Sequence, residues 1–440
     1  MSVSNDNDND KKVAVLGAGM HEWGKWGRPF VEYGLAAARD ALADAGLGWR
    51  DMQFVSGADT IRNGYPGFVS GATFAQALGW TGARVSSVYA ACASGAVAIA
   101  NARAQILAGL CDVALVVGAD TTPKGFFAPV GGGDRKDDPD WLRFHLMGAT
   151  NPTYFGLYAR RRMDRFGATE EDFAQVKVKN ARHGLANPYA RYRKEVTVDE
   201  VLASPMVADP LRLLEICATS DGGAALVLAS MDFARRHAGG ADPLVTIDAV
   251  STVTPTFPNT VIEMPNFSTD SAAAIAPAGG PDAQNGNAQN GNAQNGNAQN
   301  GNAQNAAAAA AAAGFRPSIA TAAYAEAGIG PEDVSLAEVY DLSSALELDW
   351  YEDIGLCGEG EAEKLLRDGA TTIGGRVPVN PSGGLSCFGE AIPAQAIAQV
   401  CECVWQLRGS ATGHQVEGAR VAVTANQGLF GHGSSVLLSR

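Results

Sequence analysis

The sequence predicts an α/β fold built from two related halves. Short apolar runs typical of buried strands alternate with alanine-rich helical stretches, and one such unit occurs twice. Residues 45–59, AGLGWRDMQFVSGAD, align without gaps with residues 327–341, AGIGPEDVSLAEVYD. Each copy has the pattern of a helix end, a glycine stop, a short turn and an apolar strand that ends in Asp. The repeat therefore indicates internal pseudo-symmetry.

A second strand–helix–strand unit follows in each half. In the first half it reads VSSVYAA, CASGAVAIANARAQILAG and CDVALVVGAD, and in the second half VPVNPSGGL, AIPAQAIAQVCECVWQLRG and RVAVTANQG. We place the two halves at residues 12–245 and 246–440. Residues from 121 to about 240 break the pattern and are rich in basic and aromatic side chains. We therefore predict a loop domain inserted in the first half.

Two segments have compositions unlike a folded core. Residues 1–11 are polar and acidic, and no apolar signal-peptide segment follows them. Residues from about 280 to 314 repeat an Asn-Gly unit and end in polyalanine, with no aromatic or β-branched side chain to bury. We expect both the tail and this insertion to be disordered.

Composition also limits the function classes. The net charge of −14 argues against a nucleic-acid partner, and no apolar run is long enough for a membrane span. Seven cysteines without paired spacing fit reduced thiols, so we expect a cytoplasmic protein. Cys401 and Cys403 lie in a helical pattern, and we expect no metal and no bound cofactor.

Cys92 is the first candidate reactive residue. In VYAACASGAVAIA it lies between a strand and the first turn of a helix, among small residues. The positive end of a helix lowers the pKa of a thiol and makes it a better nucleophile. The alternative is that Cys92 is simply a small residue that fits a tight strand–helix junction.

Several motifs, in this order along the chain, resemble the thiolase superfamily, and within it the branch of sterol carrier protein and lipid-transfer-protein-like thiolases. They are ACASG around Cys92, ICATSDGGAALVLAS (216–230), TTIGGRVPVNPSGGL (371–385) and ANQGLFGHGSS (425–435). The resemblance implies a thiolase-like five-layered αβαβα fold, a homodimer core and acyl-CoA as substrate.

A thiolase of this kind uses three side chains, and the chain keeps one of them. Cys92 matches the cysteine that is acylated. Glu390 in FGEAIP replaces the histidine of a Gly-His-Pro turn. In VYDLSS, Tyr340 and Leu342 replace the histidine and the cysteine of a His-Asp-Cys-Phe motif. Since one acid–base group contributes roughly 10²–10⁴-fold in rate, thiolase activity through Cys92 is disfavoured but stays open, as does a non-catalytic acyl-CoA-binding subunit.

These departures, with GADTIRNGYPGF (57–68) and the stretch 118–152, resemble the actinobacterial lipid-transfer-protein-like aldolases of cholesterol side-chain degradation. The resemblance implies retro-aldol cleavage of a steroid β-hydroxyacyl-CoA, of the 17-hydroxy-3-oxo-pregnene-20-carboxyl-CoA type. The products would be a 17-ketosteroid of the androstenedione type and propionyl-CoA. It also implies a heterotetramer with a small zinc-ribbon/OB-fold acyl-CoA-associated protein.

Two residues compete for the role of base. Tyr340 is the first candidate for base or proton relay, because the family places a catalytic residue at this strand end. Ala58 holds the equivalent position in the first half, so the fold itself does not require a phenol there. Glu390 is the rival, a carboxylate in the place of the lost imidazole. Either side chain has a structural alternative: Tyr340 as packing and Glu390 as a salt-bridged loop residue.

Further candidates surround these two. Asp341 is expected to orient its neighbours, since Asp59 matches it in the half without this chemistry. His432 either donates to the thioester oxygen or fills its turn. The backbone N–H of Cys92, together with Gly433, is expected to form an oxyanion hole.

Binding of CoA requires cations and close backbone approach. The densest basic runs are residues 159–166 and 182–195, and their alternative role is that of solvated helix charges. The candidate CoA-binding residues are Arg191 and Arg193 for the phosphates, Ser220, Asp221 and Gly222 of the TSDGG loop that resembles the family's pantetheine loop, and Gly384 of the turn NPSGGL.

Overall fold

The computed structural model describes residues 12–59, 70–122, 151–237, 244–255, 314–428 and 431–440. The predicted tail 1–11 and residues 280–313 of the predicted insertion lie outside the described residues. So do residues 60–68 and 123–150 of the two motifs that resemble the aldolases.

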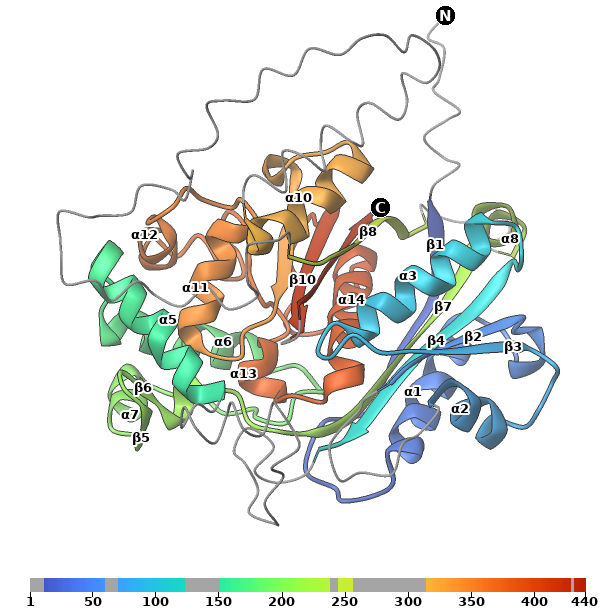
Figure 1. Ribbon diagram of the computed structural model, residues 1–440, viewed down its shortest axis with the longest axis horizontal. Helices are drawn as coiled ribbons and strands as arrows, with labels where there is room; N and C mark the ends of the chain where they lie inside the picture. The colour runs from blue at the N-terminus through green and yellow to red at the C-terminus, as the bar shows by residue number, and fades with distance from the viewer. Residues whose placement is uncertain (1–11, 60–69, 123–150, 238–243, 256–313, 429–430) are drawn as a thin grey trace, which may run out of the picture.

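Nine of the described strands form one long sheet, which consists of two sheets joined at a seam (Figure 1). Its order is β3 (Arg84–Val88), β2 (Phe54–Ala58), β4 (Val113–Thr121), β7 (Asp221–Ser230), β1 (Val13–Met20), β8 (Thr246–Val253), β11 (His432–Ser439), β10 (Val421–Gly428) and β9 (Leu336–Val339). At the seam, β1 and β8 pair through Val13 with Ile247 and Ala14 with Thr246. Each half of the chain thus supplies its own sheet.

Helices complete five layers. The helices α3 (Ser94–Leu107) and α14 (Ile392–Arg408) lie between the two sheets (Figure 1). The outer face of the first sheet is covered by α1 (Phe30–Asp44) and α2 (Ser70–Leu78), and that of the second by α10 (Phe315–Ala327), with α11 (Ser344–Asp353) packed against α10. The predicted αβαβα architecture is confirmed.

Alternation along the strands explains why the layers stack this way. Side chains of a strand point alternately to opposite faces. On β4, Val116 packs in the central core with α3 and α14, whereas Leu115 packs in the outer core with α1. On β11, Leu438 packs in the central core and Leu437 in the outer core of the second half. Both sheets are therefore apolar on both faces, as strands buried between helices should be.

The internal repeat has the predicted structure in both copies. After α1 the chain turns at Gly46 (φ 64°), forms a short 3-10 helix and enters β2. After α10 it turns at Gly328 (φ 71°), forms a second 3-10 helix and enters β9. Both glycines adopt the left-handed conformation that ends a helix without a Cβ clash.

The strand predicted to begin at residue 377 does not form, whereas residues 380–385 make the turn that the sequence indicates. The segment makes a single β-bridge, between Val379 and Ala337, and then turns into the short helix α13 (Gly384–Phe388). Two prolines, Pro378 and Pro381, lack the N–H that a strand ladder needs. Asn380 has a φ of 51°, which no strand residue adopts.

The inserted segment of the first half packs on the second half. It comprises α5 (Asn151–Phe166), α6 (Glu170–Gly184), α7 (Val198–Leu202), β5 (Met206–Ala208) and β6 (Leu211–Arg212). Both α5 and α6 contact α11, and α6 also contacts α12 (Ala362–Arg367) and α13 (Figure 1). The strand β7, within the range predicted for the loop domain, instead lies in the central sheet, and α8 (Met231–His237) follows it.

Buried ion pairs hold the insertion in place. Arg162 of α5 is 1% exposed and contacts Glu363 at 2.7 Å, Asp349 at 2.7 Å and Glu352 at 2.6 Å. Arg165 pairs with Glu359 at 2.7 Å. The basic run 159–166 therefore contributes largely to docking α5, not to a phosphate site.

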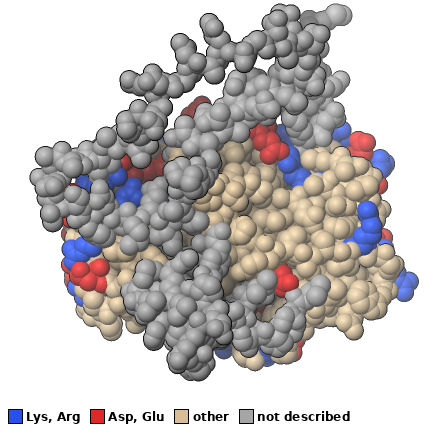
Figure 2. Space-filling view, viewed as in Figure 1, with Lys and Arg blue, Asp and Glu red and all other residues tan. Residues whose placement is uncertain are grey.

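None of the described helices is both long and apolar enough to cross a membrane. Within the described ranges no three potential ligands are placed to hold a metal ion, and no two cysteines form a disulfide bond. Charged side chains gather at the two sides of the face in Figure 2, and the described surface between them is mostly uncharged.

Candidate active site

Three predicted residues meet at one buried oxygen atom. The Tyr340 hydroxyl donates to Glu390 Oε1 at 2.6 Å, and the Cys92 thiol donates to the same atom at 3.1 Å. These partners lie 50 and 298 residues apart from Glu390 in the chain. Tyr340 is 3%, Glu390 0% and Cys92 5% exposed. The arrangement is a thiol and a phenol that share one carboxylate in the central region of the fold.

A strained turn presents Cys92. It precedes α3 directly, and Ala91 has a φ of 48°, which is rare for a residue with a Cβ. Ser94 ties the turn together, since its hydroxyl accepts from Ala90 N at 2.9 Å and donates to Ala91 O at 2.6 Å. Gly428, at the end of β10, lies against this turn: a Cβ there would be 2.5 Å from Ala90 O.

The main chain of Glu390 is fixed on both sides. Its N–H donates to Ala218 O at 2.7 Å, and its carbonyl accepts from Ser220 N at 2.9 Å and from the Thr122 hydroxyl at 3.2 Å. The Ser220 hydroxyl donates to Phe388 O at 2.5 Å. Ser220 is completely buried, and its contacts hold the main chain of residues 388–390 in place.

Asp341 anchors α13. Its carboxylate accepts from Leu385 N at 2.7 Å, from Ser386 N at 3.1 Å and from the Asn180 amide at 3.3 Å. Gly384 (φ 60°) lies so close that a Cβ would be 2.5 Å from Asp341 Oδ2. Burial raises the pKa of Asp341 well above its usual range, with a further contribution from Glu347. These contacts fix the backbone at the start of α13, and an orienting role of Asp341 in catalysis stays a prediction.

The environment of Tyr340 determines its protonation. Burial, followed by the nearby Cys92 and Glu390, raises the pKa of the phenol well above its usual value. The phenol therefore stays protonated, and its O–H is the donor of the hydrogen bond to Glu390. The main-chain carbonyl of Tyr340 accepts from Trp350 Nε1 at 2.9 Å. The phenol can accept a substrate proton only while it passes its own to the carboxylate.

The other predicted binding residues lie around the 218–222 segment. Arg191 donates to Thr219 O at 2.6 Å and to the Ser220 hydroxyl at 3.3 Å. Asp221 is buried, accepts from Gly27 N at 2.8 Å and pairs with Lys25 at 3.2 Å.

Gly222 and Arg193 have other contacts. The Trp23 ring packs on Gly222, where a Cβ would be 2.6 Å from it. Arg193 lies at the surface and pairs with Glu22 at 3.3 Å.

The two predicted residues of β11 are placed differently from each other. His432 is half-buried and pairs with Gly428 across the β10–β11 ladder. Gly433 packs on the outer helix, because a Cβ there would be 2.4 Å from Ile319 of α10. The glycine that approaches the Cys92 amide is Gly428, where a Cβ would be 3.3 Å from Cys92 N.

Sequence reasoning missed the residues that the inserted helix α6 contributes. Lys179 pairs with Glu347 at 2.6 Å and donates to Val379 O at 2.8 Å. His183 lies 3.0 Å from Asn380 O through Nδ1 and accepts from Ile373 N at 3.1 Å through Nε2. Only the alternation of basic residues on an amphipathic helix could have indicated them, and that pattern is typical of any surface helix.

Cys217 is a second missed residue. It is 5% exposed, and burial raises the pKa of its thiol well above the usual value, with further contributions from the charges of Glu390, Asp341 and Cys92. Cys217 packs in the same buried core as Cys92 and Tyr340. The motif ICATSDGG, which contains Cys217, was the only feature of the sequence that could have pointed to this residue.

Known protein families match this chain almost from end to end. The family "Thiolase, N-terminal domain" matches residues 13–232, and "Thiolase C-terminal domain-like" matches residues 295–440. The chain belongs to the thiolase superfamily.

Similar proteins place it within the superfamily. It is 32% identical to an acetyl-CoA acetyltransferase of Methanothermobacter thermautotrophicus, over 97% of this chain and 98% of that one. It is 30% identical to bovine sterol carrier protein 2, over 96% of this chain and 70% of the relative. The solved structure "Ltp2-ChsH2(DUF35) aldolase" matches with a TM-score of 0.72 and 25% identity, over 98% of both chains. The predicted sterol carrier protein 2 thiolase-like branch is confirmed.

Proposed function

We propose that this protein cleaves a steroid β-hydroxyacyl-CoA by a retro-aldol reaction, giving a 17-ketosteroid and propionyl-CoA. The substrate would be of the 17-hydroxy-3-oxo-pregnene-20-carboxyl-CoA type. The single observation that carries the proposal is the Tyr340–Glu390 contact of 2.6 Å at the place where a thiolase has its imidazole. The structural similarity to an aldolase supports it.

The reaction needs one proton path and one anion site. Tyr340 accepts the proton of the substrate hydroxyl while it donates its own to Glu390. The Cα–Cβ bond breaks, the oxygen that lost its proton becomes the ketone, and the electron pair moves into the thioester as an enolate. Protonation at Cα by the same pair gives propionyl-CoA and restores Glu390 to a carboxylate. Protons and electrons balance in these steps without a cofactor.

The enolate oxygen needs donors in a dry site. We propose the backbone N–H of Cys92 for this role, since the sharp turn at Ala91 and the helix α3 both fix its direction. His432 is the second candidate donor. In this mechanism the thiol of Cys92 forms no bond to the substrate.

One observation favours a second function. The thiol of Cys92 donates to a carboxylate at 3.1 Å, which is the contact expected of a nucleophile and its base. An acyl transfer through Cys92, as the name of the acetyltransferase relative suggests for that protein, would use this pair. In this step the thiol proton would move to Glu390, which would leave a thiolate beside a neutral carboxylic acid, and the weakly basic carboxylate makes the transfer unfavourable.

Cys92→Ala separates the two reactions. We expect the variant to keep substantial retro-aldol activity, because an enolate pathway has no acyl-enzyme. Product formation would be followed as ketosteroid and propionyl-CoA by mass spectrometry. A thousandfold loss with acyl-CoA binding intact, together with a mass increase on wild-type Cys92 after incubation with acetyl-CoA, would assign acyl transfer. Tight binding with no turnover of either kind would indicate a non-catalytic subunit.

Assembly belongs to the same proposal. We propose a homodimer core joined by a small zinc-ribbon/OB-fold acyl-CoA-associated protein, in the cytoplasm. The similar aldolase carries two component names, Ltp2 and ChsH2(DUF35), which supports a second chain. Arg191, with its contacts to the 219–220 loop, is the proposed cation for the CoA end of the substrate.

A further inference from the structure

One buried carboxylate on α11 gathers four hydrogen-bond donors. Glu347 is 0% exposed, and its Oε1 accepts from Lys179 Nζ at 2.6 Å and from the Tyr351 hydroxyl at 2.6 Å. Its Oε2 accepts from the side-chain amides of Asn180 at 2.5 Å and Asn380 at 2.9 Å. An ionised carboxylate has about four lone-pair sites, so these four bonds fill it. The donors come from α6, from α11 and from the turn before α13, and Glu347 joins the three.

The Asn380 amide takes the place of a strand partner at one edge of the sheet. β9 is the last strand in the order of the sheet, and an edge strand leaves backbone groups without a strand partner on its outer side. On this edge Asn380 Oδ1 accepts from Val339 N at 2.8 Å. Because a carboxylate can only accept, Glu347 turns the NH₂ of this amide toward itself and leaves the oxygen for Val339. Glu347 thus orients the group that holds the residue before Tyr340.

Asn180 reaches the residue on the other side of Tyr340. Its NH₂ group has two hydrogens, of which one goes to Glu347 Oε2 and the other to Asp341 Oδ2 at 3.3 Å. Asp341 follows Tyr340 directly in the chain. The residues before and after the phenol are therefore held by two amides that share one oxygen of Glu347.

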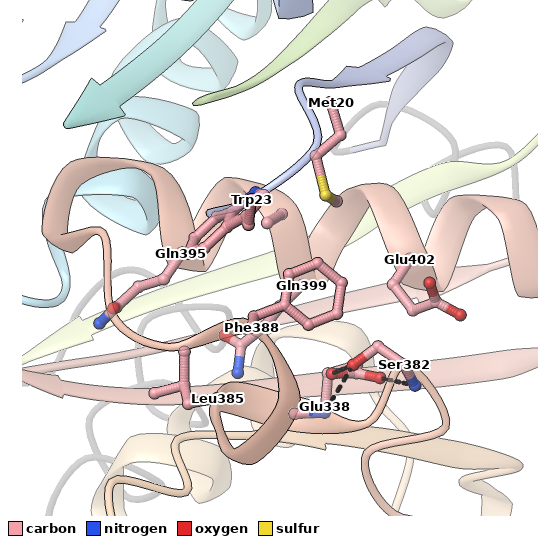
Figure 3. A pocket seen from close by; sticks show the side chains of 11 residues that line it. Met20, Trp23, Glu338, Ser382, Leu385, Phe388, Gln395, Gln399 and Glu402 are labelled. Atoms are coloured by element: carbon pink, nitrogen blue, oxygen red, sulfur yellow. Dashed lines mark hydrogen bonds between the residues drawn. The ribbon is translucent and has the colours of Figure 1, made fainter. Parts of the chain in front are cut away.

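The turn that carries Asn380 is itself fixed to β9. Figure 3 shows Glu338 of this strand bound to Ser382, whose N–H and hydroxyl donate to the two carboxylate oxygens at 2.9 and 2.8 Å. The main-chain N–H of Asn380 also donates to Ala337 O at 2.8 Å. The backbone of the turn is thus held without Glu347, and the direction of the Asn380 amide is what Glu347 sets.

We propose that Glu347 is a positioning residue for Tyr340. By orienting the two asparagine amides it holds the end of β9 so that the phenol lies 2.6 Å from Glu390 Oε1. A misplacement of about 1 Å can cost roughly 10²-fold in rate. The effect on turnover rests on the proposed retro-aldol function, in which Tyr340 moves the proton, whereas the effect on the phenol's hydrogen bond does not.

Glu347→Gln tests the proposal. A glutamine keeps the volume but carries an NH₂ group in place of one oxygen. It therefore faces donors whichever way it turns, Lys179 and Tyr351 on one side or the two asparagine amides on the other. A 3-fluorotyrosine introduced at position 340 of the full chain reports the phenol's hydrogen bond through its ¹⁹F signal. We expect this signal to move in Glu347→Gln, and kcat for a steroid β-hydroxyacyl-CoA to fall roughly 10²-fold with KM unchanged.

Glu363→Gln is the matched control. It makes the same change in a buried acid of α12, which pairs with Arg162 at 2.7 Å. It should lower the stability of the protein, while the ¹⁹F signal and kcat stay those of the wild type. An equal movement of the signal in both variants, or an unmoved signal in Glu347→Gln, would overturn the proposal.

Asn380→Gly serves where Glu347→Gln does not fold. Glycine adopts the left-handed backbone of residue 380 (φ 51°) readily, and this variant removes the amide between Glu347 and Val339. The ¹⁹F signal should again move, and an unmoved signal contradicts the proposal. The signal is read without substrate. A moved signal in a protein that cleaves no steroid β-hydroxyacyl-CoA would therefore support the positioning role and reject the proposed function.

Discussion

At the scale of single residues, the direction of proton movement depends on which group at the Glu390 oxygen holds a proton. A buried phenol with a raised pKa is a poor base alone. In the proposed mechanism the carboxylate 2.6 Å away makes it a relay, because it gains a proton on one side as it loses one on the other. The carboxylate is then the final acceptor, which gives both rival bases of the sequence a role.

Tyr340→Phe tests this relay. We expect turnover to fall roughly 10²–10⁴-fold, the contribution of one positioned acid–base group, with acyl-CoA affinity unchanged because the ring still packs. Glu390→Gln should be impaired at least as much, since it removes the final acceptor while keeping the volume. Near wild-type turnover in Tyr340→Phe, with an inactive Glu390→Gln, would show that Glu390 takes the proton directly.

The sequence was sufficient to place these residues but not their contacts. Motif register alone put Glu390 in the slot of the imidazole and Tyr340 at a strand end. Nothing local indicated that the Thr122 hydroxyl supports the Glu390 carbonyl across 268 residues. Gly428, and not the predicted Gly433, lies beside Cys92. Which glycine does so depends on the register of the β10–β11 hairpin, because the register decides which face of the sheet each glycine occupies.

At the scale of elements, α6 acts as a clamp on the segment that leads to the reactive loop. Asn180 contacts Asp341, Lys177 donates to Ser386 O at 2.8 Å, and His183 bridges Ile373 and Asn380. The segment 377–385 bonds to β9 only around Ala337, through Pro378 O and Asn380 N, and then turns away, while His183 of α6 contacts Asn380 O. Sequence patterns predict ladders well and side-chain clamps poorly, since a clamp joins residues with no fixed spacing.

The clamp should be sensitive to acid through His183. Burial, followed by the charge of Lys179, lowers the pKa of His183 to about 3 from an ordinary 6.5. Between these values the unfolded chain binds a proton that the folded chain does not. The free energy of unfolding therefore falls as pH drops from about 6.5, by at most ~1.4 kcal/mol per pH unit.

His183→Gln isolates this effect, because an amide can replace both hydrogen bonds without titrating. Urea unfolding at pH values from 7.5 to 4.5 should show a shallower loss of stability in the variant than in the wild type. His414 titrates in the opposite direction. Burial lowers its pKa, but the hydrogen bond and charge of Glu402 outweigh burial and raise it. Its stabilising contribution is therefore lost as pH rises, and it is the same in the variant and in the wild type. Parallel curves for the two proteins would contradict the assignment to His183.

At the scale of the whole molecule, the repeat in the sequence predicted two related α/β halves, and the resemblance to thiolases implied their five layers. Each half buries strands on both faces, so two sheets must share the helices between them, and α3 and α14 are those helices. Where the insertion docks could not be predicted in this way. Its position on the second half depends on Arg162 meeting three acids, all more than 180 residues further along the chain.

Dependence on a second chain is the prediction at this scale. Cys92, Tyr340 and Glu390 are at most 5% exposed, so the proposed steroid acyl-CoA would have to be held along a path that leads to them. Since the similar aldolase structure carries two component names, we expect a zinc-ribbon/OB-fold partner to complete that path. Coupling between two binding components typically amounts to about 5- to 150-fold. Turnover of a steroid β-hydroxyacyl-CoA should rise by a factor in this range when the partner is co-purified.

The control for this experiment is the partner combined with Tyr340→Phe, which should bind the acyl-CoA and release no ketosteroid. That result would place the chemistry in this chain and the added binding in its partner. Light scattering on the same samples would count the chains in the active complex. If the purified chain alone cleaved the substrate at the full rate, the partner would have no part in the site, and Arg191 with the 218–222 segment would have to hold the CoA without it.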